Sequence, residues 1–164
     1  VPLEESPDPL EWGTGECLRE GRDATIVAVG PLVYEALVAA DNLSRDGIEV
    51  EVLDARFVKP LDTALILKSV RRTGTVITLE ENAVAGGFGS AILELLSGYD
   101  VNLQNVDVMG IPDRWIPMGT QTELRSEIGL TAVEIERRIR LLLKTPEKKA
   151  PNKISHPMND ADSS

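Results

Sequence analysis

The chain has 164 residues, of which 42% are apolar, and this is enough for one globular domain with a hydrophobic core. Its 17 Lys and Arg residues stand against 27 Asp and Glu residues, which gives a formal net charge of -10. Such a charge repels phosphate backbones and anionic lipids, so we expect neither a nucleic acid nor a membrane as a partner.

The cysteine content and the N-terminal sequence bear on the compartment. The single cysteine, Cys17, cannot form an internal disulfide, and no Cys and His cluster has the spacing of metal ligands. The first residues, VPLEESPDPLEWG, are acidic and proline-rich, unlike a signal peptide, and no apolar run approaches the roughly 18 residues of a membrane span. We therefore expect a cytoplasmic protein. A start at Val1 rather than Met suits a fragment or a processed piece of a longer protein.

Short β-branched runs alternate with stretches of helical period along most of the chain. Residues 1–14 are expected to be an acidic, Pro-rich linker, and residues 15–144 a folded domain. GECLREG (15–21) predicts a short edge strand and ATIVAVG (24–30) a buried strand. A helix follows from Pro31 to about Asp46, and IEVEVLD (48–54) predicts a strand with one polar face, near a sheet edge.

The second half of the domain continues the alternation. Asp62 is placed to cap a helix that runs through Arg72, and TVITLE (75–80) predicts the next strand. A third helix is expected from about Phe88 to Ser97, and NVDVMGI (105–111) predicts a fourth parallel strand. The last helix is expected at TAVEIERRIRLLLK (131–144), with Thr131 and Glu134 as a capping box and an apolar stripe at Val133, Ile135, Ile139 and Leu142.

Residues 145–164 have three prolines, few apolar residues and no periodicity, so they are expected to form a disordered tail in which His156, the only histidine, is inert. For the domain itself, the alternation is typical of βαβ units. The predicted fold class is α/β, a three-layer, mostly parallel five-stranded sheet with helices on both faces and one antiparallel edge strand.

Polar clusters follow three of the predicted strands. They are Asp54 to Arg56, Glu80 to Asn82, and Pro112 to Arg114. In an open α/β sheet, ligands and partners meet the carboxyl ends of the strands, where such loops gather. A single cluster of this kind is most often a solvated turn. Three clusters at one edge of the sheet are either a functional site or three solvated turns, and both interpretations stay open.

The loop TLEENAVAGGFGS (78–90) allows several interpretations. Its glycines precede a helix and either bind an anion through backbone N–H groups or supply unusual backbone angles and close packing. The spacing matches neither GxGxxG nor a P-loop, which favours packing. Phe88 is either a buried anchor or a contact for a neighbouring domain. Glu80 and Glu81 are adjacent on an extended segment, so they point to opposite sides and do not form an acid/base pair.

No GxSxG elbow, no histidine in the predicted fold and no plausible setting for a cysteine nucleophile is found, so the chain alone is expected to lack catalytic residues. Three long motifs in order, DARFVKPLD (54–62), TLEENAVAGGFGS (78–90) and GIPDRWIPMGTQTELRSEIGL (110–130), closely resemble the C-terminal domain of the 1-deoxy-D-xylulose-5-phosphate synthases. These are transketolase-like thiamine-diphosphate enzymes. The resemblance covers about residues 12 to 143.

The resemblance implies an enzyme that condenses pyruvate with glyceraldehyde 3-phosphate, with loss of CO2, for isoprenoid, thiamine and pyridoxal synthesis. It implies thiamine diphosphate and Mg2+ as cofactors of the complete enzyme, held by an N-terminal and a central domain that are also this chain's partners. None of the family's catalytic, cofactor or metal residues maps onto this sequence. The isolated chain is therefore expected to bind no cofactor and to be inactive, and the complete enzyme to be a homodimer.

What the resemblance implies for this domain is interdomain and dimer packing by the strand-end loops. The candidates for this interface or active-site rim are Arg56, Glu80, Glu81, Asn82, Gly86, Gly87, Phe88, Gly89, Asp113 and Arg114. Met118 departs from relatives, which often carry a polar residue there, so it is not assigned a substrate contact. The alternatives are a separate subunit or fragment of another transketolase-like enzyme, such as a split transketolase or a 2-oxoacid dehydrogenase beta subunit, and a non-catalytic interaction module.

Overall fold

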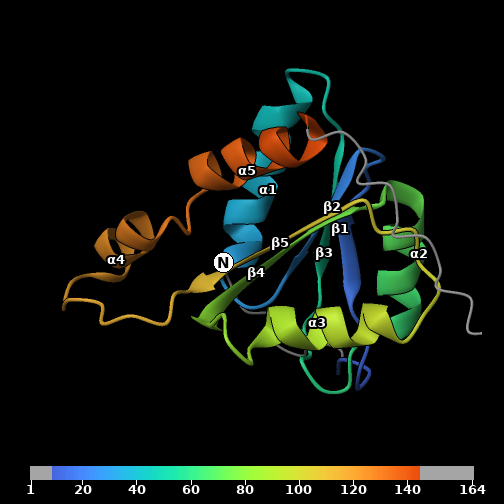
Figure 1. Cartoon of the computed structure of the whole chain (residues 1–164), viewed down its shortest axis with the longest axis horizontal. Coiled ribbons are helices and arrows are strands. Elements are labelled where there is room, and N and C mark those ends of the chain that lie inside the picture. The colour runs from blue at the N-terminus through green and yellow to red at the C-terminus, as the bar shows by residue number, and fades with distance from the viewer. Residues whose placement is uncertain (1–8, 145–164) are drawn as a thin grey trace, which may run out of the picture.

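The computed structural model describes residues 9–144, so the predictions for the first eight residues, for the tail and for His156 lie outside it. Within this range the chain alternates strands and helices (Figure 1). In chain order the elements are β1 (Glu16–Arg19), β2 (Ala24–Ala28), α1 (Leu32–Ser44), β3 (Val50–Asp54), α2 (Thr63–Thr73), β4 (Thr75–Ala83), α3 (Phe88–Ser97), β5 (Asn105–Ile111), α4 (Gln121–Ile128) and α5 (Ala132–Lys144).

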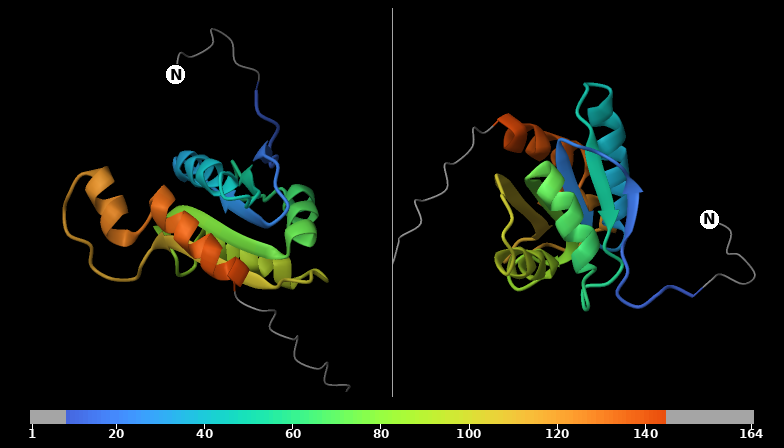
Figure 2. Two further views of the ribbon diagram at one scale, coloured as in Figure 1. Left: turned by 90° about the horizontal axis from the view of Figure 1, so that it is seen from above. Right: turned by 90° about the vertical axis from the view of Figure 1, so that its right-hand side faces the viewer.

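The five strands form one sheet in the order β1-β3-β2-β4-β5. β1 runs antiparallel to β3, and the other pairs are parallel. Helices α1 and α5 cover one face of the sheet and α2 and α3 cover the other (Figures 1 and 2). The predicted fold class is confirmed, including the antiparallel edge strand. Because the chain crosses from β3 over β2 to β4, the order of the connections reverses between β2 and β4.

Each face of the sheet has its own hydrophobic core. Successive residues of a strand point to opposite faces, so Ile26 packs with α1 and α5 while Val27 packs with α2 and α3. Both side chains are fully buried. Because β2 is buried on both sides it forms a continuous apolar run, which is the pattern that predicted it.

Two acidic side chains stabilise the starts of helices α2 and α5. Asp62 caps α2 as predicted, because its Oδ1 accepts the N–H of Leu65 at 3.0 Å. Its Oδ2 accepts the N–H of Gly15 at 3.0 Å, which joins the start of β1 to α2. Glu35 of α1 accepts the N–H of Ala132 at 2.8 Å and so holds the start of α5 against α1. The contacts to Leu65 and Ala132 satisfy N–H groups in the first turns of helices, which have no intrahelical partner.

Two predictions for the last helix were wrong in part. Val133 is 76% exposed and lies off the apolar stripe, because Ala132, Ile135 and Ile139 share the face that packs on the sheet. The capping box is incomplete: Thr131 Oγ1 accepts the N–H of Glu134 at 3.4 Å, but the Glu134 carboxylate binds two arginines of its own helix.

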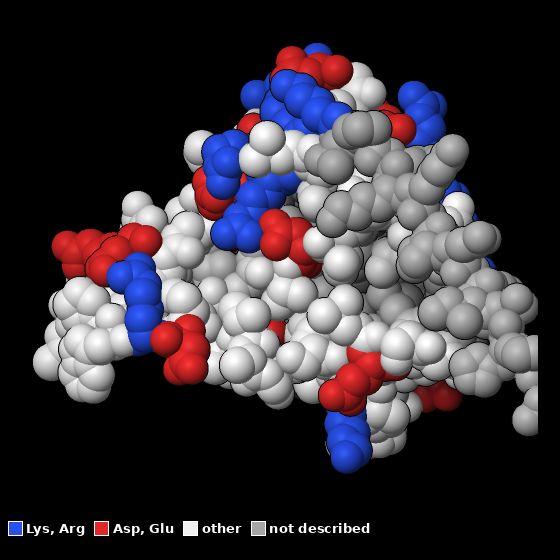
Figure 3. All heavy atoms as spheres, viewed as in Figure 1, with Lys and Arg blue, Asp and Glu red and all other residues white. Residues whose placement is uncertain are grey.

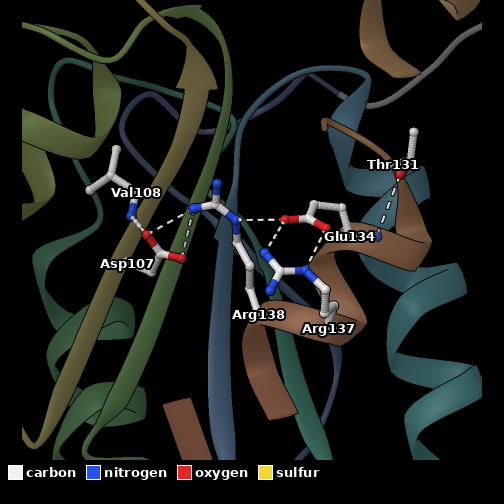
Figure 4. Close-up of polar contacts among 6 residues, drawn as sticks. All are labelled: Asp107, Val108, Thr131, Glu134, Arg137 and Arg138. Atoms are coloured by element: carbon white, nitrogen blue, oxygen red, sulfur yellow. Dashed lines mark hydrogen bonds and ion pairs between the residues drawn. The ribbon is translucent and has the colours of Figure 1, made fainter. Parts of the chain in front are cut away.

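Figure 4 shows this second set of contacts. Arg137 Nε donates to Glu134 at 2.7 Å, and Arg138 Nε donates to the same carboxylate at 3.2 Å. Arg138 also reaches Asp107 of β5, at 2.9 and 3.1 Å. The two arginines lower the pKa of Glu134 to about 2. The network attaches α5 to the edge strand β5.

Helix α4 was not predicted. It begins with a complete capping box. The Thr120 hydroxyl accepts the N–H of Glu123, and the Glu123 carboxylate accepts the N–H of Thr120 at 2.9 Å. Gly129 ends the helix in a left-handed conformation with a φ of 77°. None of the side chains of α4 is buried, so it lacks the apolar stripe that reveals a helix in a sequence.

Strand β3 contains a buried polar cluster. Its predicted polar face holds Glu51, which is 4% exposed because β1 and α2 cover it. Its carboxylate pairs with Arg72 and accepts the Ser69 hydroxyl, both from α2. Ser69 in turn lies 2.7 Å from Thr25 Oγ1 of β2. The polar side of the strand therefore faces protein and binds α2 to the sheet.

Candidate functional site

The three polar clusters that the sequence places after strands lie at one edge of the sheet. β3, β4 and β5 are parallel, so their carboxyl ends at Asp54, Ala83 and Ile111 point the same way. A hollow of about 380 Å³ joins the first two loops and is lined by Val58 together with Asn82, Gly86 and Gly87. The loop after β5, with Asp113 and Arg114, lies at the far end of the row, next to β4. We call these three loops the rim.

Glu80 lies inside the domain. Its side chain is fully buried, and its carboxylate accepts the N–H groups of Phe88 at 2.6 Å and Gly89 at 2.8 Å. These groups belong to the first turn of α3, where the helix dipole favours a negative charge. The anion position at this helix start is therefore occupied by the protein's own carboxylate.

The glycines of this loop allow the contact to form. A β-carbon at Gly87 would lie 2.3 Å from Glu80 Oε2, so a larger residue would displace the carboxylate. A β-carbon at Gly89 would lie 2.4 Å from Val108 Cγ1 of β5. Phe88 is 1% exposed and belongs to the core beside α2. Of the alternatives for this loop, close packing is the one that the structure supports, and Phe88 is a buried anchor.

Glu81 points the other way from Glu80, as adjacent residues of a strand do. Arg125 Nε of α4 donates to its carboxylate at 2.5 Å, and Gln121 donates at 3.3 Å. The hydrogen bond that Arg125 donates to Glu81 raises the pKa of Arg125. Glu81 thus connects the rim to α4, and its side chain is still 27% exposed.

Arg56 begins the loop after β3 in a conformation that is uncommon for a residue with a side chain. Its φ is 54°, in the left-handed region. Its N–H donates to Asp54 Oδ1 at 2.9 Å, and its guanidinium pairs with Glu16 of β1. The guanidinium is therefore engaged within the domain and steadies the loop next to the edge strand.

The remaining candidates face solvent. Asn82, Gly86, Asp113 and Arg114 are exposed, so they are free to meet another molecule. Two neighbours that were not among the candidates are also exposed, Trp115 at 90% and Met118 at 100%. The sequence signal for them is the spacing of large apolar side chains in a loop that is rich in proline and glycine.

A second hollow of about 430 Å³ lies between α4 and the sheet. Its walls are mainly apolar, from Ile111, Leu124, Ile128 and Leu130, and the Glu81–Arg125 pair borders it. Arg125 Nη2 is shielded from solvent and has no hydrogen-bond partner within residues 9–144. Arg125 was missed in the sequence, because a lone arginine in an unpredicted helix gives no pattern.

The chemistry available in this part of the chain is limited. No group of three or more His, Cys, Asp or Glu residues within residues 9–144 is placed to hold a metal ion. Burial and the neighbouring Glu51 raise the pKa of Cys17, so its thiol stays protonated and is a weak nucleophile. Among the helices of residues 9–144, none has the length and apolar character needed to span a membrane.

Comparison with known proteins identifies the family of this chain. Residues 13–135 match the family model "Transketolase, C-terminal domain". The chain is 48% identical over 135 residues to 1-deoxy-D-xylulose-5-phosphate synthase 1 of Geobacter sulfurreducens. It is 54% identical over 141 residues to the synthase of Magnetococcus marinus, and 45% identical over 157 residues to that of Heliobacterium modesticaldum.

These matches cover 82 to 96% of this chain but 21 to 24% of the relatives, so the chain spans less than a quarter of their length. Among solved structures it is similar to a split-gene transketolase described as an inactive beta4 tetramer, with a TM-score of 0.76 and 40% identity over 87% of this chain and 46% of that chain. A transketolase mutant from Pichia stipitis shares the fold, with a TM-score of 0.56 and 20% identity over 80% of this chain and 18% of that chain.

Proposed function

Because this chain belongs to the transketolase C-terminal domain family, we propose that it is the C-terminal domain of a 1-deoxy-D-xylulose-5-phosphate synthase. The observation that supports this most directly is the 45 to 54% identity to such synthases over 82% or more of the chain. The same relatives are about four times as long as this chain, which leaves room for the catalytic domains.

The proposed reaction of the complete protein is the condensation of pyruvate with glyceraldehyde 3-phosphate, with loss of CO2. Its product feeds isoprenoid, thiamine and pyridoxal synthesis, in the cytoplasm. Thiamine diphosphate with Mg2+ supplies the stabilised carbanion chemistry when it is bound. We assign its binding to the preceding domains, because the rim has no metal-ligand cluster and the start of α3 is filled by Glu80.

The contribution of this chain in that enzyme is the support of domain and subunit contacts. The exposed candidates, Asn82, Gly86, Asp113 and Arg114, are proposed to touch the neighbouring domains. The buried ones act indirectly, since Glu80, Phe88 and Gly89 fix the loop from within. Arg56 and Glu81 orient the neighbouring segments through their ion pairs.

The test is an assay of the polypeptide in its native length. An immunoblot of source-cell extract with an antibody to this domain gives the size, and the purified protein is then incubated with pyruvate and glyceraldehyde 3-phosphate, with and without thiamine diphosphate. We expect a band several times heavier than 17.8 kDa and thiamine-dependent release of CO2. A long polypeptide that lacks this activity would refute the proposal.

A separate subunit of a split transketolase is the second candidate, supported by the 40% identity to the split-gene transketolase. The matched segment makes up 46% of the split-gene transketolase chain, so that chain is about twice as long as the segment. An immunoblot band of intermediate size, together with activity that appears only after a second polypeptide is added, would favour this candidate over the synthase.

A further inference from the structure

The hollow between α4 and the sheet has the composition of a small-molecule site. Its apolar walls come from three parts of the chain, with Ile111 at the end of β5, Leu124 in α4 and Leu130 before α5. Leu124 and Ile128 are four residues apart, so they share the face of α4 that borders the hollow, and both are half-buried. The volume of about 430 Å³ lies within the range of ligand pockets, which are mostly apolar and have a few polar groups at fixed places.

Glu81 supplies a polar group at the border of this hollow. Arg125 Nε and Gln121 Nε2 both donate to one of its carboxylate oxygens, Oε1. No group within residues 9–144 donates to the other oxygen, Oε2, and the side chain is 27% exposed. Because each carboxylate oxygen accepts hydrogen bonds, Oε2 is available to a donor on a ligand.

The charges around the hollow favour an uncharged ligand. The guanidinium of Arg125 and the carboxylate of Glu81 form an ion pair at its border, so each neutralises the other. A cation in the hollow would lie beside the guanidinium, and an anion would lie beside the carboxylate of a chain whose net charge is -10. Figure 3 shows a basic side chain between acidic ones over α4, so both signs of charge are present there.

The guanidinium also bears on whether the ligand donates or accepts. Arg125 Nη2 has no hydrogen-bond partner within residues 9–144, but it is shielded from solvent and is therefore shielded from a ligand as well. The Glu81 carboxylate is partly exposed. A ligand that donates a hydrogen bond thus finds a partner at this border more readily than one that accepts.

We propose that the hollow is a binding site for a small, uncharged and mainly apolar molecule that donates one hydrogen bond, from an O–H or N–H group, to Glu81. Its apolar body lies against Leu124, Ile128 and the end of β5. Because Glu81 belongs to the rim and Leu124 to α4, the ligand holds these two parts of the domain together. The inference goes beyond the proposed function and does not depend on it, since its test measures binding and not catalysis.

The experiment compares two probes of the same shape in the complete polypeptide. Indole has an N–H donor, and benzofuran has an ether oxygen in its place. Saturation-transfer NMR measures the affinity of each probe. We expect indole to bind with a dissociation constant of about 1 mM, as suits a molecule of its size, and benzofuran to bind at least about fivefold more weakly, because it has no donor for Glu81.

Two variants of α4 locate the bound probe. Leu124→Trp fills the hollow from its wall, and we expect it to weaken indole binding at least about tenfold. The matched control Ser126→Trp places the same side chain on the exposed side of α4 and should leave the affinity unchanged. In the wild type, indole at about ten times its dissociation constant should slow hydrogen exchange of the 121–128 amides about tenfold and leave the amides of α2 unchanged.

Three outcomes would overturn the inference. Equal affinities of indole and benzofuran would show that no hydrogen bond to Glu81 forms. Unchanged indole binding in Leu124→Trp would place the probe at another site. The absence of saturation transfer from both probes would show that the hollow is covered or binds nothing in the complete polypeptide. Because the comparison of the two probes uses the wild type, it decides the matter even if Leu124→Trp fails to fold.

Discussion

Glu80 and Glu81 show how much depends on single side chains at the rim. The two are adjacent, yet one carboxylate is fully buried against α3 and the other binds Arg125 of α4. The alternation of a strand made their opposite directions predictable from the sequence. Which of the two would be buried was not predictable, because β4 is covered on both faces and its residues are apolar on both.

Substitution of Glu80 is expected to lower stability. Glu80→Gln keeps one acceptor but loses the negative charge at the start of α3, and we expect a loss of about 1–2 kcal/mol in the free energy of unfolding. Glu80→Ala leaves two buried N–H groups unpaired and should cost about 2–4 kcal/mol. Urea denaturation of the chain measures both. The control Glu94→Gln, on the exposed side of α3, is expected to change little. Equal stabilities of Glu80→Gln and wild type would contradict the capping role.

The stability of the protein in acid should depend on Glu134. Arg137 and Arg138 lower its pKa from 4.5 to about 2, so its ion pairs stabilise the folded state above about pH 4.5. This contribution is lost as the pH falls from 4.5 through 2. Because the pairs are partly exposed, we expect about 0.5–1 kcal/mol. In urea denaturation, Glu134→Gln should be less stable than wild type by this amount at pH 7 and equal to it near pH 2. A constant difference over this range would argue against the lowered pKa.

Helix α4 is the element that the sequence did not reveal. It has no apolar stripe, and its boundaries are marked only by the capping box at Thr120 and Glu123 and by Gly129. The other four helices were predicted because their buried faces repeat every three or four residues. Its half-buried side chains, Leu124, Arg125 and Ile128, are too few to give such a pattern.

Reversing the charge at Glu81 is expected to release α4. In the complete enzyme, Glu81→Arg should place two arginines together and impair subunit assembly or turnover by severalfold. The double variant Glu81→Arg/Arg125→Glu restores the ion pair with the two charges exchanged between β4 and α4. If Glu81 acts by holding α4, the double variant should recover most of the loss in sedimentation and in the activity assay.

Failure of the double variant to recover would show that Glu81 touches the neighbouring domain itself. If Glu81→Arg alone leaves both assembly and turnover unchanged, then Glu81 has no part in the interdomain contact. The variant Glu94→Arg serves as a control for charge alone, because it makes the same change of charge at an exposed position of α3 that is not a rim candidate.

At the scale of the whole domain, most of the fold was predictable. Continuous apolar runs and helical periods locate the five strands and four of the helices within a few residues, and right-handed crossovers restrict their order. For the candidate site, the sequence predicted the location but not the contacts between the side chains. The sequence indicates which loops share an edge, but the ion pairs that bind Arg56 to Glu16 and Glu81 to Arg125 join segments 40 and 44 residues apart, for which no local pattern exists.

The isolated chain is expected to associate weakly with itself through its exposed apolar side chains. Sedimentation velocity at high protein concentration should show a small fraction of larger species, and this fraction should grow with salt, which screens the net charge of -10. Trp115→Ser/Met118→Ser should remove most of it. The control Val133→Ser alters an exposed apolar residue on α5 and should have little effect. A monomeric profile of the wild type at every concentration would contradict the prediction.

The carboxylate of Glu80 at the start of α3 has a consequence for inhibitor design. A loop with three glycines before a helix invites the search for compounds that carry a phosphate or a sulfonate. Here the backbone donors of Phe88 and Gly89 are already paired with the carboxylate of Glu80, so a second anion would have to displace that carboxylate to reach them. Compounds that imitate a phosphorylated sugar should therefore gain little affinity from the start of α3.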